Sequence, residues 1–495
     1  MSFIMNKTLQ YVGSLILGVS VFLFWWLLHP GALAFQEQNQ LFLFTWDYLA
    51  ERVAVAGGLA DYVAEFFTQF NYVPVLGEVL MAILFVIFQR SIAETIGKGE
   101  WYLLSFIAPV MMLIYMIDFY VLLSYMVALI ISVHLCILYR NHPNVIWASI
   151  ATVLGYWLIG PAVFVFTVYA ALKEKNNYSL ILISLAIVAV VVSKLTYMEQ
   201  YPWKTVLCGV NYYRRAVTVP AMQVYIAIAS VMPSVLSELL PRPKAGVNAL
   251  LGFAIVAGGV WGVHNNYQKD VVELFAYENL VRHEDWSAVL KRAEKYQPNS
   301  ELGSVTVNLA LIMSGRGAEM PNFKQFGTKG LIQPRVRDYI SNSASSEVFW
   351  RLGMINECLR YAFDTQESLV NNRKSGRWMS RIAECQMLNG RYDVAEKYLD
   401  ILSHSLFYRK WAENQRQYLR DEETIMSNNV YAYLKTVRYK EDFLFFYPEM
   451  DKMLAKLYFE NNNNVLAAWY YQAWTAFKKN ESNVQETHTG NAHGN

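Results

Sequence analysis

Residues 145–175 read VIWASIATVLGYWLIGPAVFVFTVYAALKEK, and the conformation of this stretch decides the topology of everything that follows it. The stretch is apolar enough to cross a membrane, but Gly160 and Pro161 lie near its middle. Proline has no backbone N–H to donate, and it disfavours a helical conformation in the residue before it. The stretch is therefore either one long kinked span or two short helices that turn at Gly160-Pro161.

Seven further apolar segments accompany this stretch, and each has roughly the ~17 to 25 residues that a bilayer requires of a helix. They cover residues 11–28, 73–88, 101–117, 119–139, 178–192, 221–236 and 248–263. The first segment has no small-residue cleavage site after it, so we interpret it as a retained span rather than a signal peptide. We predict a polytopic helical bundle over residues 1–265, with about nine spans if residues 145–175 form two helices and eight if they form one.

The number of spans decides which loops share a side of the membrane. With nine spans and a cytoplasmic N-terminus, residues 36–70, Asp118, residues 196–218 and the whole C-terminal region lie outside. With eight spans, the last two of these regions lie inside. The Lys and Arg residues in the connections favour neither count, so the positive-inside rule leaves both open.

The sequence changes character after His264, where charged residues become frequent and apolar residues recur at helical spacing. Residues 377–414 resemble the tetratricopeptide consensus of small and large residues on a helix pair, and Trp411 follows Trp378 by about one 34-residue repeat. We predict an all-α soluble domain of helical hairpins over residues 266–478, followed by a disordered tail over 479–495. The consensus-like residues, which we expect to be buried between helices, are Trp378, Ala383, Leu388, Tyr392, Ala395 and Tyr398.

Composition excludes several classes of function. The net charge of +2 gives no reason to expect a nucleic-acid partner. The four cysteines show no C-x-x-C spacing, which argues against a zinc site or a redox pair. The sequence contains no H-E-x-x-H, P-loop, G-x-S-x-G or Rossmann fingerprint, which argues against zinc proteolysis, nucleotide hydrolysis and serine hydrolysis.

The loop after the first apolar segment, residues 30–73, is too polar for a span and too apolar for a plain soluble loop. Asp47 and Glu51 are four residues apart, as are Asp61 and Glu65, so each pair shares one face of a helix. Aromatic and aliphatic residues supply the opposite face. We predict two amphipathic helices that lie along the membrane interface and are broken at Gly57-Gly58.

The order of these segments resembles the GT-C glycosyltransferases. The resemblance rests on an acidic amphipathic first loop, a hairpin of two spans and the words LGYWLIGPAVFVFTVYAAL. It implies nine spans, a polyprenyl phosphate or diphosphate sugar donor, and an acidic residue of the first outer loop that acts on the acceptor. Residues 36–70 also resemble an uncharacterised family of multi-pass envelope proteins from Bacteroidetes. A membrane core followed by tetratricopeptide-like repeats is similar to one eukaryotic branch of protein mannosyltransferases.

The resemblance implies a site with a general base for the acceptor hydroxyl and cations for the leaving phosphate. A carboxylate at a partly apolar interface has a pKa suited to the base, and arginine grips phosphate oxygens bidentately. The acidic candidates, in order, are Asp47, Asp61, Glu78 and Asp118. The candidates for binding the lipid phosphate are Lys204, Arg214 and Arg215. No cofactor is implied beyond the lipid-linked donor, and the sequence leaves metal dependence open.

A plainer interpretation stands beside each of these roles. Surface carboxylates are mostly inert, and a basic cluster before a span commonly contacts lipid headgroups or marks the inner face. Two functions therefore compete with the transferase: a membrane-anchored repeat scaffold for envelope assembly, and a transporter or flippase. We expect a bacterial inner-membrane protein with a periplasmic C-terminal domain, and its partners are membrane lipid, a polyprenyl-linked sugar and a protein or glycan acceptor.

Overall fold

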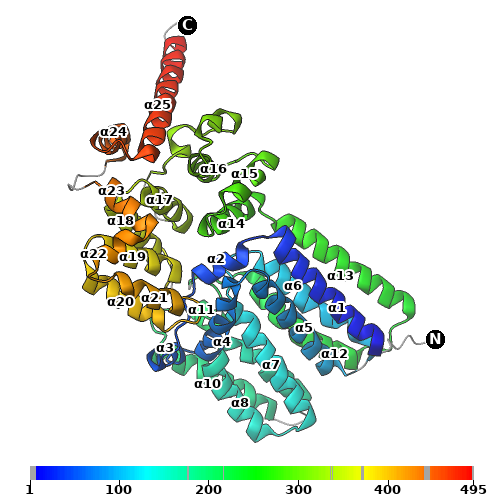
Figure 1. Ribbon diagram of the computed structural model, residues 1–495. Helices are drawn as coiled ribbons and strands as arrows, with labels where there is room; N and C mark the ends of the chain where they lie inside the picture. The colour runs from blue at the N-terminus through cyan, green and yellow to red at the C-terminus, as the bar shows by residue number, and fades with distance from the viewer. Residues whose placement is uncertain are drawn as a thin grey trace. The chain divides into compact units, whose positions relative to one another are not determined.

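The computed structural model describes residues 7–492 except 98, 175–177, 216, 335, 337, 370–372 and 440–445, with the backbone alone over 482–492. In this part of the chain the regular structure is helical, apart from one antiparallel bridge between Val121 and Tyr213. The chain forms two compact units (Figure 1). The membrane unit comprises residues 1–37 and 44–268, and the helical unit comprises residues 38–43 and 269–495. The membrane unit ends at residue 268, three residues beyond the predicted end at residue 265.

Eight helical segments among the described residues of the membrane unit are long and apolar enough to cross a membrane. They are Lys7–Leu28 (α1 with η1), Leu76–Ile96 (α5), Gly99–Met116 (η3 with α6), Leu123–Asn141 (α7), Val145–Lys173, Tyr178–Thr196 (α10), Ala221–Leu239 (α12) and Ala245–Asn266 (α13). The fold is thus a polytopic helical bundle, as predicted. These eight segments include Val145–Lys173 as one, although it contains two helices, and the number of membrane crossings stays a prediction.

That fifth segment is a helical hairpin. It consists of α8 (Val145–Ile159), the short turn η4 (Gly160–Ala162) and α9 (Val163–Lys173). Thr152 Oγ1 and Thr167 Oγ1 lie 3.2 Å apart, whereas a straight helix would separate these residues by about 22 Å. Gly160 makes the reversal with a positive φ of 67°, a conformation that glycine adopts without strain. Of the two alternatives for residues 145–175, the protein adopts the pair of short helices.

Contacts between helix termini define two ends of the membrane unit. We call the end that carries residues 29–75 the loop end, and there the Tyr267 hydroxyl donates to Leu28 O over 2.9 Å. At the opposite end, the turn end, Lys173 pairs with Glu238 and Arg242 pairs with Glu100 at 3.3 Å. Because the hairpin returns the chain to the end from which it came, α13 finishes at the loop end. The chain therefore leaves for residues 269–495 from the same end that carries the long first loop.

The first loop forms three short helices: α2 (Ala32–Gln38), α3 (Trp46–Val53) and α4 (Gly58–Thr68). Thr45 caps α3, since its side chain accepts a hydrogen bond from Tyr48 N at 3.3 Å. Gly57 separates α3 from α4 with a φ of 89°. The prediction of two helices broken at Gly57-Gly58 is confirmed, and their position along a membrane surface stays a prediction.

The helical unit consists of consecutive helices, of which neighbouring pairs such as α17 and α18, α19 and α20, and α24 and α25 pack as hairpins. Their bounds are Lys269–Arg282 (α14), Trp286–Lys295 (α15), Glu301–Met313 (α16), Tyr339–Arg351 (α17), Ile355–Glu367 (α18), Gly376–Leu388 (α19), Tyr392–Ser403 (α20), Arg409–Gln415 (α21), Glu422–Ser427 (α22), Asn429–Val437 (α23), Met450–Glu460 (α24) and Val465–Ala492 (α25). Helix α25 continues to Ala492, through residues for which we predicted no regular structure. The resemblance to tetratricopeptide repeats stays a prediction.

The core of the helical unit contains most of the residues that the sequence placed there. Trp378, Ala383, Leu388 and Ala395 are buried. Tyr392 is only half-buried, because its hydroxyl reaches outward to donate to Glu422 Oε1 at 2.8 Å. Tyr398 is half-buried as well. The helical spacing therefore predicted the buried face correctly for four residues, but it wrongly included the two half-buried tyrosines.

Candidate functional site

Two of the predicted acidic residues differ sharply in their surroundings, although both lie in the first loop. Asp47 is in the first turn of α3 and is exposed. Asp61 is in α4 and is buried. It belongs to an ion cluster in which Arg52 Nε lies 3.0 Å from Glu65 and 4.0 Å from Asp61. Tyr48 completes the cluster by donating its hydroxyl hydrogen to Glu65.

The protonation states of this cluster follow from its burial and its charges. Burial by itself lowers the pKa of Arg52, but Glu65, Tyr48 and Asp61 together outweigh this effect, and the pKa is raised overall. Burial, together with Glu65, raises the pKa of Tyr48 well above its ordinary value. Arg52 is therefore charged and Tyr48 is protonated at neutral pH. The cluster joins α3 to α4 as a structural unit, and Asp61 serves in it as a counter-ion.

A second polar module brings together three predicted residues that are far apart in the sequence. Asp118, between α6 and α7, accepts from Tyr213 OH at 2.7 Å and from Tyr120 N at 3.0 Å. Arg214 N donates to Tyr120 O at 2.8 Å. These contacts bring Asp118 and Arg214, with the adjacent Arg215, together at the loop end of the membrane unit.

The two arginines of this module differ in what they offer a ligand. Arg214 is 5% exposed, and its Nε donates to Phe119 O at 3.2 Å. Arg215 is exposed, with its guanidinium 4.2 Å above the ring of Tyr120 and its Nη2 2.8 Å from the hydroxyl of that tyrosine. Arg215 thus presents free surface to an anion, whereas Arg214 holds the loop together.

The remaining predicted residues lie on separate elements. Glu78 is half-buried in the first turn of α5, and Lys204 is exposed on the short helix α11 (Trp203–Cys208). Of the seven predicted residues, one belongs to the ion cluster and three belong to the second polar module. The other three, Asp47, Glu78 and Lys204, lie apart from both. None of the seven residues lines the apolar cavity found elsewhere in the membrane unit.

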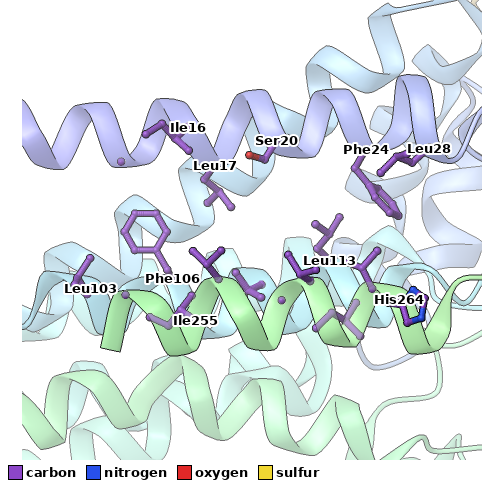
Figure 2. A pocket seen from close by; sticks show the side chains of 18 of the residues that line it. Ile16, Leu17, Ser20, Phe24, Leu28, Leu103, Phe106, Leu113, Ile255 and His264 are labelled. Carbon is purple, nitrogen blue, oxygen red and sulfur yellow. The ribbon is translucent and has the colours of Figure 1, made fainter. Parts of the chain in front are cut away.

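That cavity is an apolar groove of about 890 Å³ between α1, η3 with α6, and α13. Figure 2 shows Leu17 of α1 and Phe24 of η1 directed across the groove toward Phe106, Leu113 and Ile255. The lining extends along α1 and η1 from Leu9 to Leu28. At a helical rise of 1.5 Å per residue this is about 28 Å, close to the ~30 Å hydrocarbon thickness of a bilayer. The groove is therefore about as long as the part of a lipid hydrocarbon chain that lies within the bilayer core.

Three glycines form part of the lining of the groove. Gly13, Gly252 and Gly259 line it, so the facing helices present no side chain at these points. The sequence carried a weak signal of this kind in the GFAIVAGGVWGV run of α13. We did not predict the groove, because glycine is common in transmembrane helices whether or not they face a cavity.

The loop end of the groove is its more polar end. His264 and Tyr267 line it there (Figure 2 shows His264). The buried ring of His29 lies edge-on to Tyr267, with 6.2 Å between ring centroids. Burial lowers the pKa of His29 to about 4, so this ring is neutral at neutral pH. Among the described residues, no group of three His, Cys, Asp or Glu side chains could hold a metal ion.

Residues 5–494 match the family of unknown function DUF6057, and the match extends over both units, so the chain belongs to this family. No curated protein and no solved structure matches the chain.

The ion cluster predicts a difference between two glutamates that both approach Arg52. Glu65 is 1% exposed, whereas Glu51 is 62% exposed and lies 3.9 Å from Arg52. Glu65→Gln leaves the buried Arg52 with the more distant Asp61 and the exposed Glu51 to balance it, and we expect it to destabilise the protein by roughly 3 kcal/mol, the lower end for a broken buried pair. Glu51→Gln should cost less than about 1 kcal/mol. Thermal unfolding of the purified protein in detergent measures both, and equal midpoints would contradict the structural role of Glu65.

Proposed function

We propose that this member of the DUF6057 family holds the hydrocarbon chain of a membrane lipid in the groove between α1, α6 and α13. We further propose that the lipid is a polyprenyl-linked sugar, which the protein uses as a glycosyl donor at its loop end. The single observation that carries the proposal is the groove, because its length and apolar lining fit a long chain. The GT-C resemblance supplies the class of reaction.

The physical chemistry of such a site differs from that of a soluble pocket. A lipid chain in a bilayer is already in an apolar medium, so its transfer into the groove gains little from the hydrophobic effect. Selectivity must then come from the shape of the groove and from polar contacts to the headgroup. Polar groups line the groove at the loop end, where His264 and Tyr267 lie. This distribution favours a headgroup at the loop end and a chain that extends toward the turn end.

The loop end also carries the groups that the reaction requires. Asp47 remains the candidate base, because its carboxylate is exposed. The candidate for the phosphate is Arg215, together with the exposed Lys204, because Arg214 is used to hold the loop. Asp61 is the weaker acidic candidate, since it already balances Arg52. In this proposal the loop end faces the periplasm of a bacterial inner membrane, and the helical unit receives the protein or glycan acceptor.

The lipid half of the proposal predicts opposite results for two glycines of α13. A Cβ on Gly252 would lie 3.7 Å from Leu103, an ordinary contact, so Gly252→Leu should fold while filling the groove. A Cβ on Gly258 would meet no atom of another helix within 4 Å, and Gly258 does not line the groove, which makes Gly258→Leu the matched control. Mass spectrometry of lipid that copurifies with each variant should show polyprenyl phosphate lipid with wild type and Gly258→Leu, and a large loss with Gly252→Leu.

The same lipid on all three proteins would contradict the groove as its site. Because the measurement does not depend on turnover, it separates binding from catalysis.

The reaction half predicts that Asp47→Asn nearly abolishes glycan production, since loss of a positioned general base costs ~100- to 10,000-fold in rate. Arg215→Ala should act mainly on the use of donor, and Asp61→Asn should act through stability. The measurement is the glycan profile of cells that carry each variant at matched membrane abundance. If these variants leave the profile unchanged while deletion of residues 269–478 alters it, the protein is a membrane-anchored scaffold instead.

A further inference from the structure

Six residues of the first loop belong to the helical unit rather than to the membrane unit. They are residues 38–43, with the sequence QNQLFL, and we call them the strap. The first five are buried and the sixth, Leu43, is half-buried. The strap begins with Gln38, the last residue of α2, and has no regular structure from residue 40 onward. A buried, irregular segment needs partners for its backbone and side-chain polar groups.

The helical unit supplies these partners from α17, from α19 and from the segment just before α19. Gln38 Oε1 accepts from Arg377 Nη1 at 2.8 Å and from Tyr339 OH at 3.3 Å. Leu41 N donates to Lys374 O at 2.8 Å. Arg377 lies in the first turn of α19, and Tyr339 begins α17. The strap is thus bound by specific polar contacts in addition to the burial of Leu41 and Phe42.

The seat for Gln38 is held in place by a buried network of charges. Arg377 Nη1 lies 2.6 Å from Glu278, and its Nη2 lies 3.1 Å from Glu347. Arg381 also contacts Glu347, at 3.1 Å. Burial raises the pKa of Glu347, but Arg381, Arg377 and Arg351 outweigh this effect and lower it to about 2, so the carboxylate is charged at neutral pH. The positive and negative charges of this network neutralise one another. The strap contains no charged residue, so its binding leaves the net charge of the network unchanged.

We propose that the strap is an intramolecular peptide ligand that anchors the helical unit non-covalently to the chain of the membrane unit. The chain passes between the units three times, at residues 37–38, 43–44 and 268–269. If only the last connection existed, the helical unit would be tethered by one linker. With the strap bound, it stays attached even when that linker is cut. The tethering of the strap at both ends raises its effective concentration at this seat, which favours it over a free competing peptide.

The test uses the full chain with a specific protease site inserted between Gln268 and Lys269, where no helix is interrupted. After cleavage in membranes and washing, the quantity measured is the fraction of the fragment starting at Lys269 that stays in the pellet. We expect retention with the native strap and release, several-fold above native, with the double variant Gln38→Ala/Leu41→Pro. That variant removes the side-chain acceptor and the backbone donor to Lys374 O. Gln40→Ala, in the same segment but outside these hydrogen bonds, should be retained like the native chain.

Release of the native fragment after cleavage would overturn the proposal, and so would full retention of the double variant. A second measurement guards against a variant that fails to fold. With the four native cysteines replaced by serine, Leu41→Cys/Lys374→Cys should form a disulfide that links the two pieces of the cleaved chain on a non-reducing gel. Absence of this link in a chain that binds membranes normally would also overturn the proposal.

Discussion

The hydroxyl of Tyr212 bridges the break in the hairpin of α8 and α9. It donates to Ile159 O and accepts from Ala162 N at 3.1 Å, on either side of Gly160. Gly57 N donates to Trp157 O at 2.8 Å beside the same break. A helix that reverses among apolar helices leaves backbone groups that no bulk water can satisfy, so partners of this kind are required. The turn has no room for a side chain at residue 160, because a Cβ on Gly160 would lie 2.8 Å from the Tyr212 oxygen. The direction of every later helix depends on this reversal.

One consequence is the placement of α13 against α1, where the Tyr267 hydroxyl reaches Leu28 O and the groove lies between the helices. Another is that the chain leaves the membrane unit from the end that carries the first loop. Several charged side chains at that end make structural contacts: Arg52 pairs with Glu65, Arg214 donates to a backbone carbonyl, and Asp118 accepts from Tyr213. The exposed charges are then the ones able to act on a substrate. The structure therefore leaves fewer candidate residues for the proposed reaction than the sequence did, because it separates charged side chains that make structural contacts from those that are exposed.

The features that could be predicted from the sequence are those that show in hydrophobic periodicity and in the placement of glycine and proline. Hydropathy located every apolar segment, Gly160-Pro161 located the reversal, and Gly57-Gly58 located the break between α3 and α4. The groove escaped prediction because its lining consists of the same aliphatic residues that any lipid-facing helix carries. The strap escaped because QNQLFL has no helical or strand period, and its fit depends on Arg377, more than 330 residues away along the chain. The partners of Asp61 and Arg214 likewise became visible only in three dimensions, since spacing places residues on a face but does not say what they contact.

The central claim is that the hairpin carries the chain through the bundle and back, so that the first loop and residues 197–220 lie on one side of the membrane. The most direct measurement places single cysteines in a chain without native cysteines and labels intact cells with a membrane-impermeant thiol reagent. The variants are Asp47→Cys and Arg215→Cys for the loop end, and His142→Cys and Arg242→Cys for the turn end; all four positions are exposed. The account predicts that the first two react alike and that the last two give the opposite result. Reaction of Asp47→Cys with protection of Arg215→Cys, or the reverse, would contradict it.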